Sequence, residues 1–232
     1  MHEAGKVFFR KIGSFGPLPA SMMSSLSTPS LSTSLFQALE RHAREAPHSI
    51  ACASRFRLAS YRKLWSRIER ATARLQGEWE VRPGDVVAYW GDGHPDALVL
   101  YVALARCGAL LLPMEHAAAR AALPQLAGKV ALALAVHDDE LRAPRIAQPV
   151  HPLSRLIGEP CAYQATVSVP DPDTCSLLRL EQDGSLQRLS LRQLAEAADS
   201  GLRDLRGALF DADVLGPTVL PALCAGDTLR WL

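Results

Sequence analysis

The sequence predicts an α/β fold, in which a parallel-rich sheet is flanked by helices and a second, smaller lobe follows. Three observations support this prediction. Short apolar strands alternate with periodic helices, the connections between them are short, and a hairpin signal opens a second block near residue 174. Alternation of this kind is typical of parallel sheets that are covered by helices.

Composition limits the classes of protein to consider. The chain has 232 residues, 48% hydrophobic and 21% charged, with a formal net charge of +1. This is enough apolar material for a core, and the near-neutral charge disfavours a nucleic-acid-binding protein. The longest apolar run, residues 97–105, is too short to cross a bilayer. Five widely spaced cysteines suit a reducing compartment, so we expect a cytoplasmic protein without a membrane or nucleic-acid partner.

The domain organisation follows from shifts in composition. Residues 1–33 are rich in Ser, Thr, Gly and Pro, which predicts a mobile tail. A first α/β block is predicted over residues 34–140 and a Pro-rich connection over residues 141–173. A second α/β block is predicted over residues 174–232.

The elements of the first block are predicted from caps and periodicity. Ser34 and Ser60 are placed to cap helices, and Pro47 stops the first of these. The helix that starts at Tyr61 has an apolar inner face, and its predicted outer face is Arg62, Lys63, Arg67, Arg70 and Arg74. The predicted elements are a helix at 34–45, strands at 50–53 and 56–58, and a helix at 61–79.

The next elements begin after a Pro83-Gly84 turn. They are a strand at 86–90, a helix at 95–107, a strand at 109–112, a helix at 117–128 and a strand at 130–136. The helix at 95–107 is apolar nearly all round, which predicts burial on most sides. Asp92 and His94 precede this helix, either as helix-entry residues or as part of a small-molecule site. Residues 137–140 are predicted to be a solvated turn rather than a metal site.

The connection carries at most a short strand at 145–147. The second block starts with a predicted hairpin, formed by strands at 175–180 and 186–189. A helix at 191–205, a helix at 217–224 and a strand at 228–232 complete the prediction.

Several segments occur in a specific order. They are Ser60-Tyr61-Arg62-Lys63-Leu64, then Val81-Arg82-Pro83-Gly84-Asp85-Val86-Val87-Ala88, then Pro95-Asp96, then Ala105-Arg106-Cys107-Gly108-Ala109, and finally Leu112-Pro113. This order resembles the N-terminal part of the adenylate-forming superfamily. That superfamily comprises acyl-CoA synthetases, adenylation domains of nonribosomal peptide synthetases, and luciferases. The resemblance implies the same α/β fold and an ATP-dependent acid-thiol ligase as the family activity.

Members of that superfamily grip the ATP phosphates with a loop rich in Ser, Thr and Gly that also carries a Lys. In this chain the corresponding position holds Glu181, Gln182, Asp183, Gly184 and Ser185. This segment has one Gly and no Lys, and its two carboxylates repel phosphate. The family's adenine, ribose and magnesium contacts, and its C-terminal lid, correspond to positions beyond residue 232. We therefore expect no adenylation by the chain alone, no catalytic or metal-binding residues, and no cofactor. ATP and magnesium are expected only if the resemblance extends to activity.

Three functional hypotheses follow. The first is a pseudoenzyme or scaffold that binds a protein or an acyl or peptidyl carrier. The second is a part of a split or truncated ligase that another polypeptide completes. A ligand-binding domain for a hydrophobic carboxylic acid is a third.

Two further residues are candidates for binding. The pair Phe210-Asp211 looks like a family segment in which the Asp lies in the substrate pocket, so the resemblance implies that role for Asp211. Trp231 is predicted to anchor a homodimer or a partner, because a terminal strand there exposes apolar surface that soluble proteins usually cover.

Overall fold

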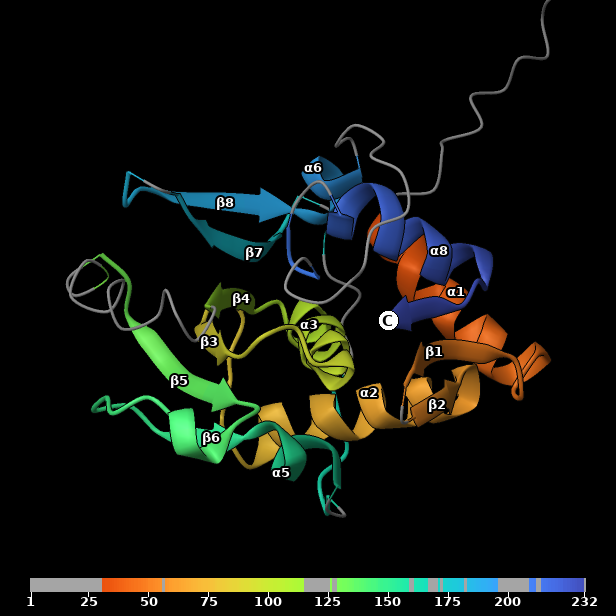
Figure 1. Cartoon of the computed structure of the whole chain (residues 1–232), viewed down its shortest axis with the longest axis horizontal. Helices are drawn as coiled ribbons and strands as arrows, with labels where there is room; N and C mark the ends of the chain where they lie inside the picture. The colour runs from red at the N-terminus through yellow and green to blue at the C-terminus, as the bar shows by residue number, and fades with distance from the viewer. Residues whose placement is uncertain are drawn as a thin grey trace, which may run out of the picture.

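The computed structural model describes residues 31–231 apart from residues 56, 115–125, 127–128, 159–160, 167–170, 172, 182, 196–208 and 212–213. The described strands form two sheets, a six-stranded sheet in the order β6-β5-β3-β4-β7-β8 and a three-stranded sheet in the order β2-β1-β9 (Figure 1). All pairs are parallel except β1 with β2 and β7 with β8. The strands are β1 Ile50–Ser54, β2 Arg57–Ser60, β3 Val86–Trp90, β4 Leu110–Met114, β5 Leu132–His137, β6 Val150–Pro152, β7 Cys175–Leu180, β8 Leu186–Ser190 and β9 Leu229–Trp231.

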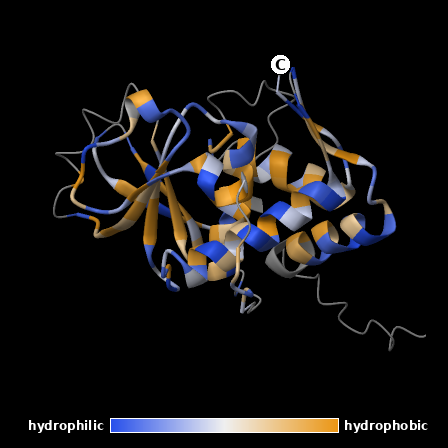
Figure 2. Cartoon of the chain, turned by 90° about the horizontal axis from the view of Figure 1, so that it is seen from below, coloured by the Kyte–Doolittle hydropathy of each residue, from blue (hydrophilic) through white to orange (hydrophobic). Residues whose placement is uncertain are grey.

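The helices pack on these sheets around one central helix, α3. It lies in the middle of the molecule (Figure 1), and every residue from Ala97 to Cys107 is buried. Apolar residues are concentrated on the strands of the six-stranded sheet and on the helices (Figure 2). The helices are α1 Leu31–Glu45, α2 Tyr61–Gly77, α3 Pro95–Cys107, α5 Leu153–Gly158, α6 Leu191–Ala195, a π-helix Leu215–Val219 that continues into α8 Leu220–Ala225, and a 3₁₀ helix Glu140–Arg142.

The bounds predicted for α3 are confirmed, because both of its ends carry local signals. Pro95 occupies the first turn, and His94 Nδ1 accepts a hydrogen bond from the Asp96 amide at 3.1 Å. Gly108 ends the helix with φ 70°, a left-handed conformation that glycine adopts without strain. The start of α2 is also confirmed, with Ser60 as its N-cap.

The predicted solvent face of α2 is wrong at two positions, because Arg67 and Arg74 are 6% and 1% exposed. Arg67 is paired with the Asp96 carboxylate at 2.9 Å, and Arg74 with Glu78 at 3.0 Å. Arg74 also donates to the carbonyls of Arg155 and Leu156 in α5. Charge pairing therefore buries two residues that periodicity alone assigned to solvent.

The predicted Pro-rich connection contributes two elements to the fold. Strand β6 pairs with β5, and α5 buries Leu153, Leu156 and Ile157. The strand predicted at residues 145–147 is wrong; the chain pairs with β5 only from Val150 onward, and the preceding residues form no ladder.

The second block completes the sheets of the first and does not stand apart as a smaller lobe. Strand β7 pairs with β4 at Leu111 and Leu177, and β9 pairs with β1. The physical reason is that β4 and β1 would otherwise be edge strands with unpaired backbone groups, which β7 and β9 pair with. One hydrophobic cluster accordingly includes residues from both blocks, such as Leu100 and Val219.

Some predicted features lie outside the described residues. They are residues 1–30 of the expected tail, most of the helix expected at 117–128, and residues 196–205 of the helix expected at 191–205. Helix α1 begins at Leu31, three residues before the predicted start. All five cysteines are free thiols. Among the described residues, no helix combines the length and apolarity that a membrane span needs.

Gly216 provides a test of the packing of the second block. A Cβ added at Gly216 would come within 1.7 Å of the Leu194 carbonyl oxygen, so Gly216→Ala forces the π-helix away from α6. We expect Gly216→Ala to lower the free energy of unfolding by about 2 kcal/mol, measured by urea denaturation. Gly158→Ala is the matched control, because nothing lies within 4 Å of its added Cβ. Equal midpoints for the two variants would contradict the described packing.

Asp96 provides a test of how α3 is held. Its carboxylate pairs with Arg67, whose side chain is 7% exposed, and with Arg57 at 2.8 Å. Asp96→Asn leaves the Arg67 cation buried without its partner, so we expect a loss of about 2 kcal/mol of stability in thermal or urea denaturation. Asp173→Asn removes an exposed ion pair with Arg192, and its cost should stay below about 1 kcal/mol. If both variants lose the same stability, Asp96 does not anchor α3.

Candidate functional site

A cavity of about 500 Å³ opens where the small sheet meets the carboxyl ends of β3 and β5. These two strands are parallel neighbours, and their connections leave in opposite directions along the sheet, from β3 to β4 and from β5 to β6. Ligands of open α/β sheets are usually bound in the crevice at such a switch point.

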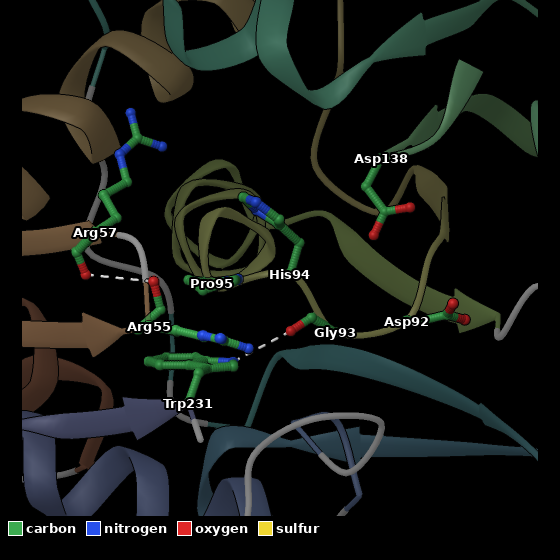
Figure 3. Close-up of a pocket in the computed structure, with 9 residues that line it drawn as sticks. Arg55, Arg57, Asp92, Gly93, His94, Pro95, Asp138 and Trp231 are labelled. Carbon is green, nitrogen blue, oxygen red and sulfur yellow. Dashed lines mark hydrogen bonds between the residues drawn. The ribbon is translucent and has the colours of Figure 1, made fainter. Parts of the chain in front are cut away.

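The cavity is lined by residues from both sheets. Arg55 comes from the turn between β1 and β2, and Arg57 is the first residue of β2. The loop before α3 brings Asp92 and His94, and Asp138 directly follows β5. Arg55 extends across the indole ring of Trp231, while Asp92 and Asp138 lie toward the opposite end (Figure 3). The lining residues are Ser54, Arg55, Arg57, Asp92, Gly93, His94, Pro95, Asp138 and Trp231.

A network of hydrogen bonds fixes the loop that follows β3. Tyr89 Oη donates to Asp138 Oδ2 at 2.6 Å, and the His94 amide donates to Tyr89 Oη at 3.2 Å. Trp231 Nε1 donates to the Gly93 carbonyl at 3.2 Å. A side chain at Gly91 would clash with this network, since its Cβ would lie 2.3 Å from Asp138 Oδ2. The cavity therefore has a preorganised wall.

Burial keeps one member of this network neutral. The pKa of Tyr89 is raised well above its ordinary value, first by burial and then by its hydrogen bond to Asp138. The phenol thus stays a donor and holds the Asp138 carboxylate in place. With arginines at one end and carboxylates at the other, the cavity suits a polar ligand.

The turn between β7 and β8 is the segment where the resemblance predicts the phosphate loop, and the amides of Glu181, Gly184 and Ser185 all donate hydrogen bonds within the turn. The Glu181 amide donates to the Ser185 carbonyl, and the Gly184 amide to the Glu181 carbonyl, each at 2.9 Å. The Ser185 amide donates to Asp183 Oδ1 at 2.8 Å. Gln182 lies outside the described residues.

The charged side chains of this turn are Glu181, which is paired with an arginine, and Asp183, which is negatively charged. Hydrogen bonds from Ser185, its side chain first and its amide second, hold the pKa of Asp183 below the ordinary value. Asp183 is therefore an anion at neutral pH. Glu181 pairs with Arg179 at 2.8 Å, and Lys129 Nζ donates to the Gly184 carbonyl at 2.7 Å. The residues present do not fit a nucleotide triphosphate, because the amides of Glu181, Gly184 and Ser185 face protein acceptors and Asp183 would repel phosphate.

The structure brings some predicted site residues together and separates others. Asp92 and His94 both line the cavity. Asp211 is exposed and does not line it; its carbonyl accepts hydrogen bonds from the amides of Val214 and Leu215, and Phe210 packs against Tyr89. The substrate role that the resemblance implies for Asp211 stays a prediction.

Trp231 is 3% exposed, buried within its own chain. Its indole both donates to Gly93 and forms a wall of the cavity. The structure thus gives Trp231 an intramolecular role, and its role at an interface stays a prediction.

Sequence reasoning missed Arg55, Arg57 and Asp138. No local signal marks the two arginines, because only the pairing of β1 with β9 carries their turn to Trp231. Asp138 had a usable signal: it directly follows a strand of a predicted parallel sheet, and the carboxyl ends of such strands meet at one edge. Within the described part of the chain, no group of His, Cys, Asp or Glu could hold a metal ion.

Comparison with known proteins identifies relatives of this chain. It is 29% identical over 211 residues to a feruloyl-CoA synthase of an Amycolatopsis species, an alignment that covers 82% of this chain and 42% of that protein. The chain therefore spans less than half the length of this relative. A carboxylic acid reductase of Mycobacterium tuberculosis is 36% identical over 64 residues, or 28% of this chain and 6% of that protein.

Solved structures agree with the fold. The N-terminal subdomain of Klebsiella oxytoca NpsA, in complex with 3-hydroxyanthranilyl-AMSN, matches with a TM-score of 0.66 at 18% identity, covering 85% of this chain and 53% of that one. The nonribosomal peptide synthetase FmoA3 matches with a TM-score of 0.68 at 18% identity, and the match covers 85% of this chain and 22% of FmoA3.

A family model described as AMP-binding enzyme matches residues 39–199, which is more than half of the chain. These residues include the central helix α3, the strands β1, β2, β3 and β5 beside the cavity, and the β7–β8 turn, but not β9. The expected resemblance is confirmed: the chain belongs to the AMP-binding enzyme family.

Proposed function

We propose that this chain is a non-catalytic member of the AMP-binding family, a pseudoenzyme or scaffold that acts by binding a protein or carrier partner. The β7–β8 turn carries the proposal. At the position where the family grips phosphate, this chain has a short closed turn with a charged Asp183.

The physical argument concerns what the triphosphate of ATP requires. Phosphate binding at a loop needs several unpaired amides, hydroxyls or a cation pointing at the ligand. The amides of Glu181, Gly184 and Ser185 already donate to protein oxygens. Opening the turn would cost these hydrogen bonds, and the Asp183 carboxylate would still repel the phosphates. ATP and magnesium are therefore not proposed as cofactors of the chain.

Two surfaces are available to a ligand or partner. The cavity at the ends of β3 and β5 has space for a small group carried by a partner. Strand β9 is at the edge of its sheet, with no partner on its outer side among the described residues. An edge strand presents unpaired backbone groups that another chain can pair with, so a homodimer or a protein partner is proposed there.

The alternative is that the chain forms part of an acid-thiol ligase completed by another polypeptide. One observation favours it: β7 is parallel to β4, and β4 to β3, so the β7–β8 turn lies at the same edge of the sheet as the cavity. A second polypeptide bound at this edge would contact both the β7–β8 turn and the cavity. The names of the relatives, feruloyl-CoA synthase and a complex with 3-hydroxyanthranilyl-AMSN, suggest an aromatic acid as the substrate in that case.

The proposal predicts that magnesium-ATP does not raise the melting temperature of the chain. A ligand at a hundred times its dissociation constant stabilises a protein by about 2.7 kcal/mol, which a thermal shift measures easily. The measurement is a titration of magnesium-ATP to millimolar concentration, with magnesium chloride alone as the control. The double variant Glu181→Gln, Asp183→Asn should behave like the unmodified chain, because its backbone amides stay engaged.

The outcomes separate the two functions. A saturable shift in the unmodified chain contradicts the pseudoenzyme proposal and supports the ligase alternative. A shift that appears only in the double variant would show that charge alone, and not the closed turn, keeps ATP out.

A further inference from the structure

A second cavity, of about 250 Å³, lies beside α2 and the end of α3. One of its walls is the segment 161–166, which contributes Cys161, Tyr163, Gln164 and Ala165 to the lining. The other lining residues belong to α2 and to the last turn of α3. Access to this cavity therefore depends on how firmly the segment 161–166 is attached to α2.

Gln76, in the last turn of α2, holds one end of the segment. Its Nε2 donates to the Thr166 carbonyl at 3.0 Å, and the Thr166 amide donates to Gln76 Oε1 at 2.9 Å. Both hydrogen bonds are exposed to solvent. Because water competes for exposed hydrogen bonds, this pair holds the segment only weakly.

Tyr163 attaches the middle of the segment by packing on Gly77. A Cβ added at Gly77 would lie 2.2 Å from Tyr163 Cγ, so the side chain lies directly against the end of α2. Tyr163 is nevertheless 52% exposed, and Ala162, Gln164 and Thr166 are exposed as well. The segment thus buries little apolar surface against the rest of the chain.

The elements on either side of the segment are held more firmly. Helix α5 buries Leu153, Leu156 and Ile157 in the main hydrophobic cluster, and β7 is paired with both β4 and β8. Residues 161–166 belong to no helix or strand, and within the described part of the chain they hydrogen-bond only to Gln76. Few buried contacts and exposed hydrogen bonds are typical of segments that open locally.

We propose that residues 161–166 form a strap that detaches from α2 as a unit and opens the cavity behind it while the rest of the chain stays folded. Gln76 and Gly77 are the attachment points on α2. Tyr163 and Thr166 are three residues apart, or about 10 Å in an extended chain, so release at one point loosens the other. The strap controls the access of small molecules to the cavity.

The strap is separate from the cavity at the ends of β3 and β5. That cavity lies at the start of α3 and the strap lies near its end, and α3 has 13 residues, which corresponds to about 20 Å. Opening of the strap is therefore expected whether or not the chain binds ATP.

The test observes each end of the strap while the other end is altered. Labelling of Cys161 by N-ethylmaleimide, located by mass spectrometry, reports opening beside Tyr163. Hydrogen exchange of the Thr166 amide, followed by NMR, reports opening at Gln76. In the unmodified chain both rates should be independent of urea below the unfolding transition, because a local opening exposes little surface. Cys107, which is 4% exposed, should be labelled only through global unfolding, at a rate that rises with urea.

Two variants weaken the strap at different points. Gln76→Ala removes both hydrogen bonds at one end and should raise the labelling rate of Cys161 at the other end about tenfold. Gly77→Ala displaces Tyr163 and should raise the exchange rate of the Thr166 amide by a similar factor. The urea midpoint of global unfolding should stay close to that of the unmodified chain in both variants.

Two controls make the result specific. Gly158→Ala should change neither rate, because nothing lies within 4 Å of its added Cβ. In a Tyr163→Ala background, Gly77→Ala should have no further effect, because the ring that it displaces is gone.

Three results would overturn the proposal. One is faster exchange of the Thr166 amide in Gln76→Ala without faster labelling of Cys161, which would show that the two ends move separately. Another is labelling of Cys161 that depends on urea in the same way as labelling of Cys107. The third is an unchanged exchange rate of the Thr166 amide in Gly77→Ala.

Discussion

Burial of helix α3 is the constraint on which the rest of the structure depends. Every residue from Ala97 to Cys107 is buried, so this helix must be enclosed on all sides. Its side chains join those of α1, α2, the six-stranded sheet and the C-terminal elements in one hydrophobic cluster. Each fully buried Leu or Val of such a helix contributes about 2 kcal/mol relative to exposure, so the burial of α3 stabilises the fold substantially.

The two ends of α3 hold the polar groups that its apolar middle excludes. At the start, Asp96 pairs with Arg67 and Arg57, and His94 caps the helix at the edge of the cavity at the ends of β3 and β5. At the end, Arg106 lies against Trp65 with two donors unsatisfied.

Elements with local signals could be predicted from the sequence, and elements that depend on distant pairing could not. Helix α3 and strand β3 were predicted with the observed bounds, because Pro95, Gly108 and the preceding turn are local markers. The burial of Arg67 could not be predicted, since its carboxylate partner is 29 residues away. The same holds for Arg74, whose backbone acceptors are more than 80 residues away.

The candidate site was only partly predictable for the same reason. Asp92 and His94 could be predicted as candidate site residues, because they lie in the loop between a predicted strand and a predicted helix. Arg55 reaches the cavity because β1 pairs with β9, a contact between residues near 53 and 230 that no local pattern indicates. Strand β6 was misplaced because its ladder with β5, and not its own composition, selects Val150–Pro152.

The central claim is that the amides of the β7–β8 turn are committed to the turn itself and do not bind phosphate. The most direct measurement is an NMR titration of ¹⁵N-labelled protein with magnesium-ATP, observed at the amides of Glu181, Gly184 and Ser185. The account predicts that these three resonances keep their chemical shifts at millimolar magnesium-ATP. A saturable movement of all three would contradict it, because it would show that the turn opens and that its amides bind the nucleotide.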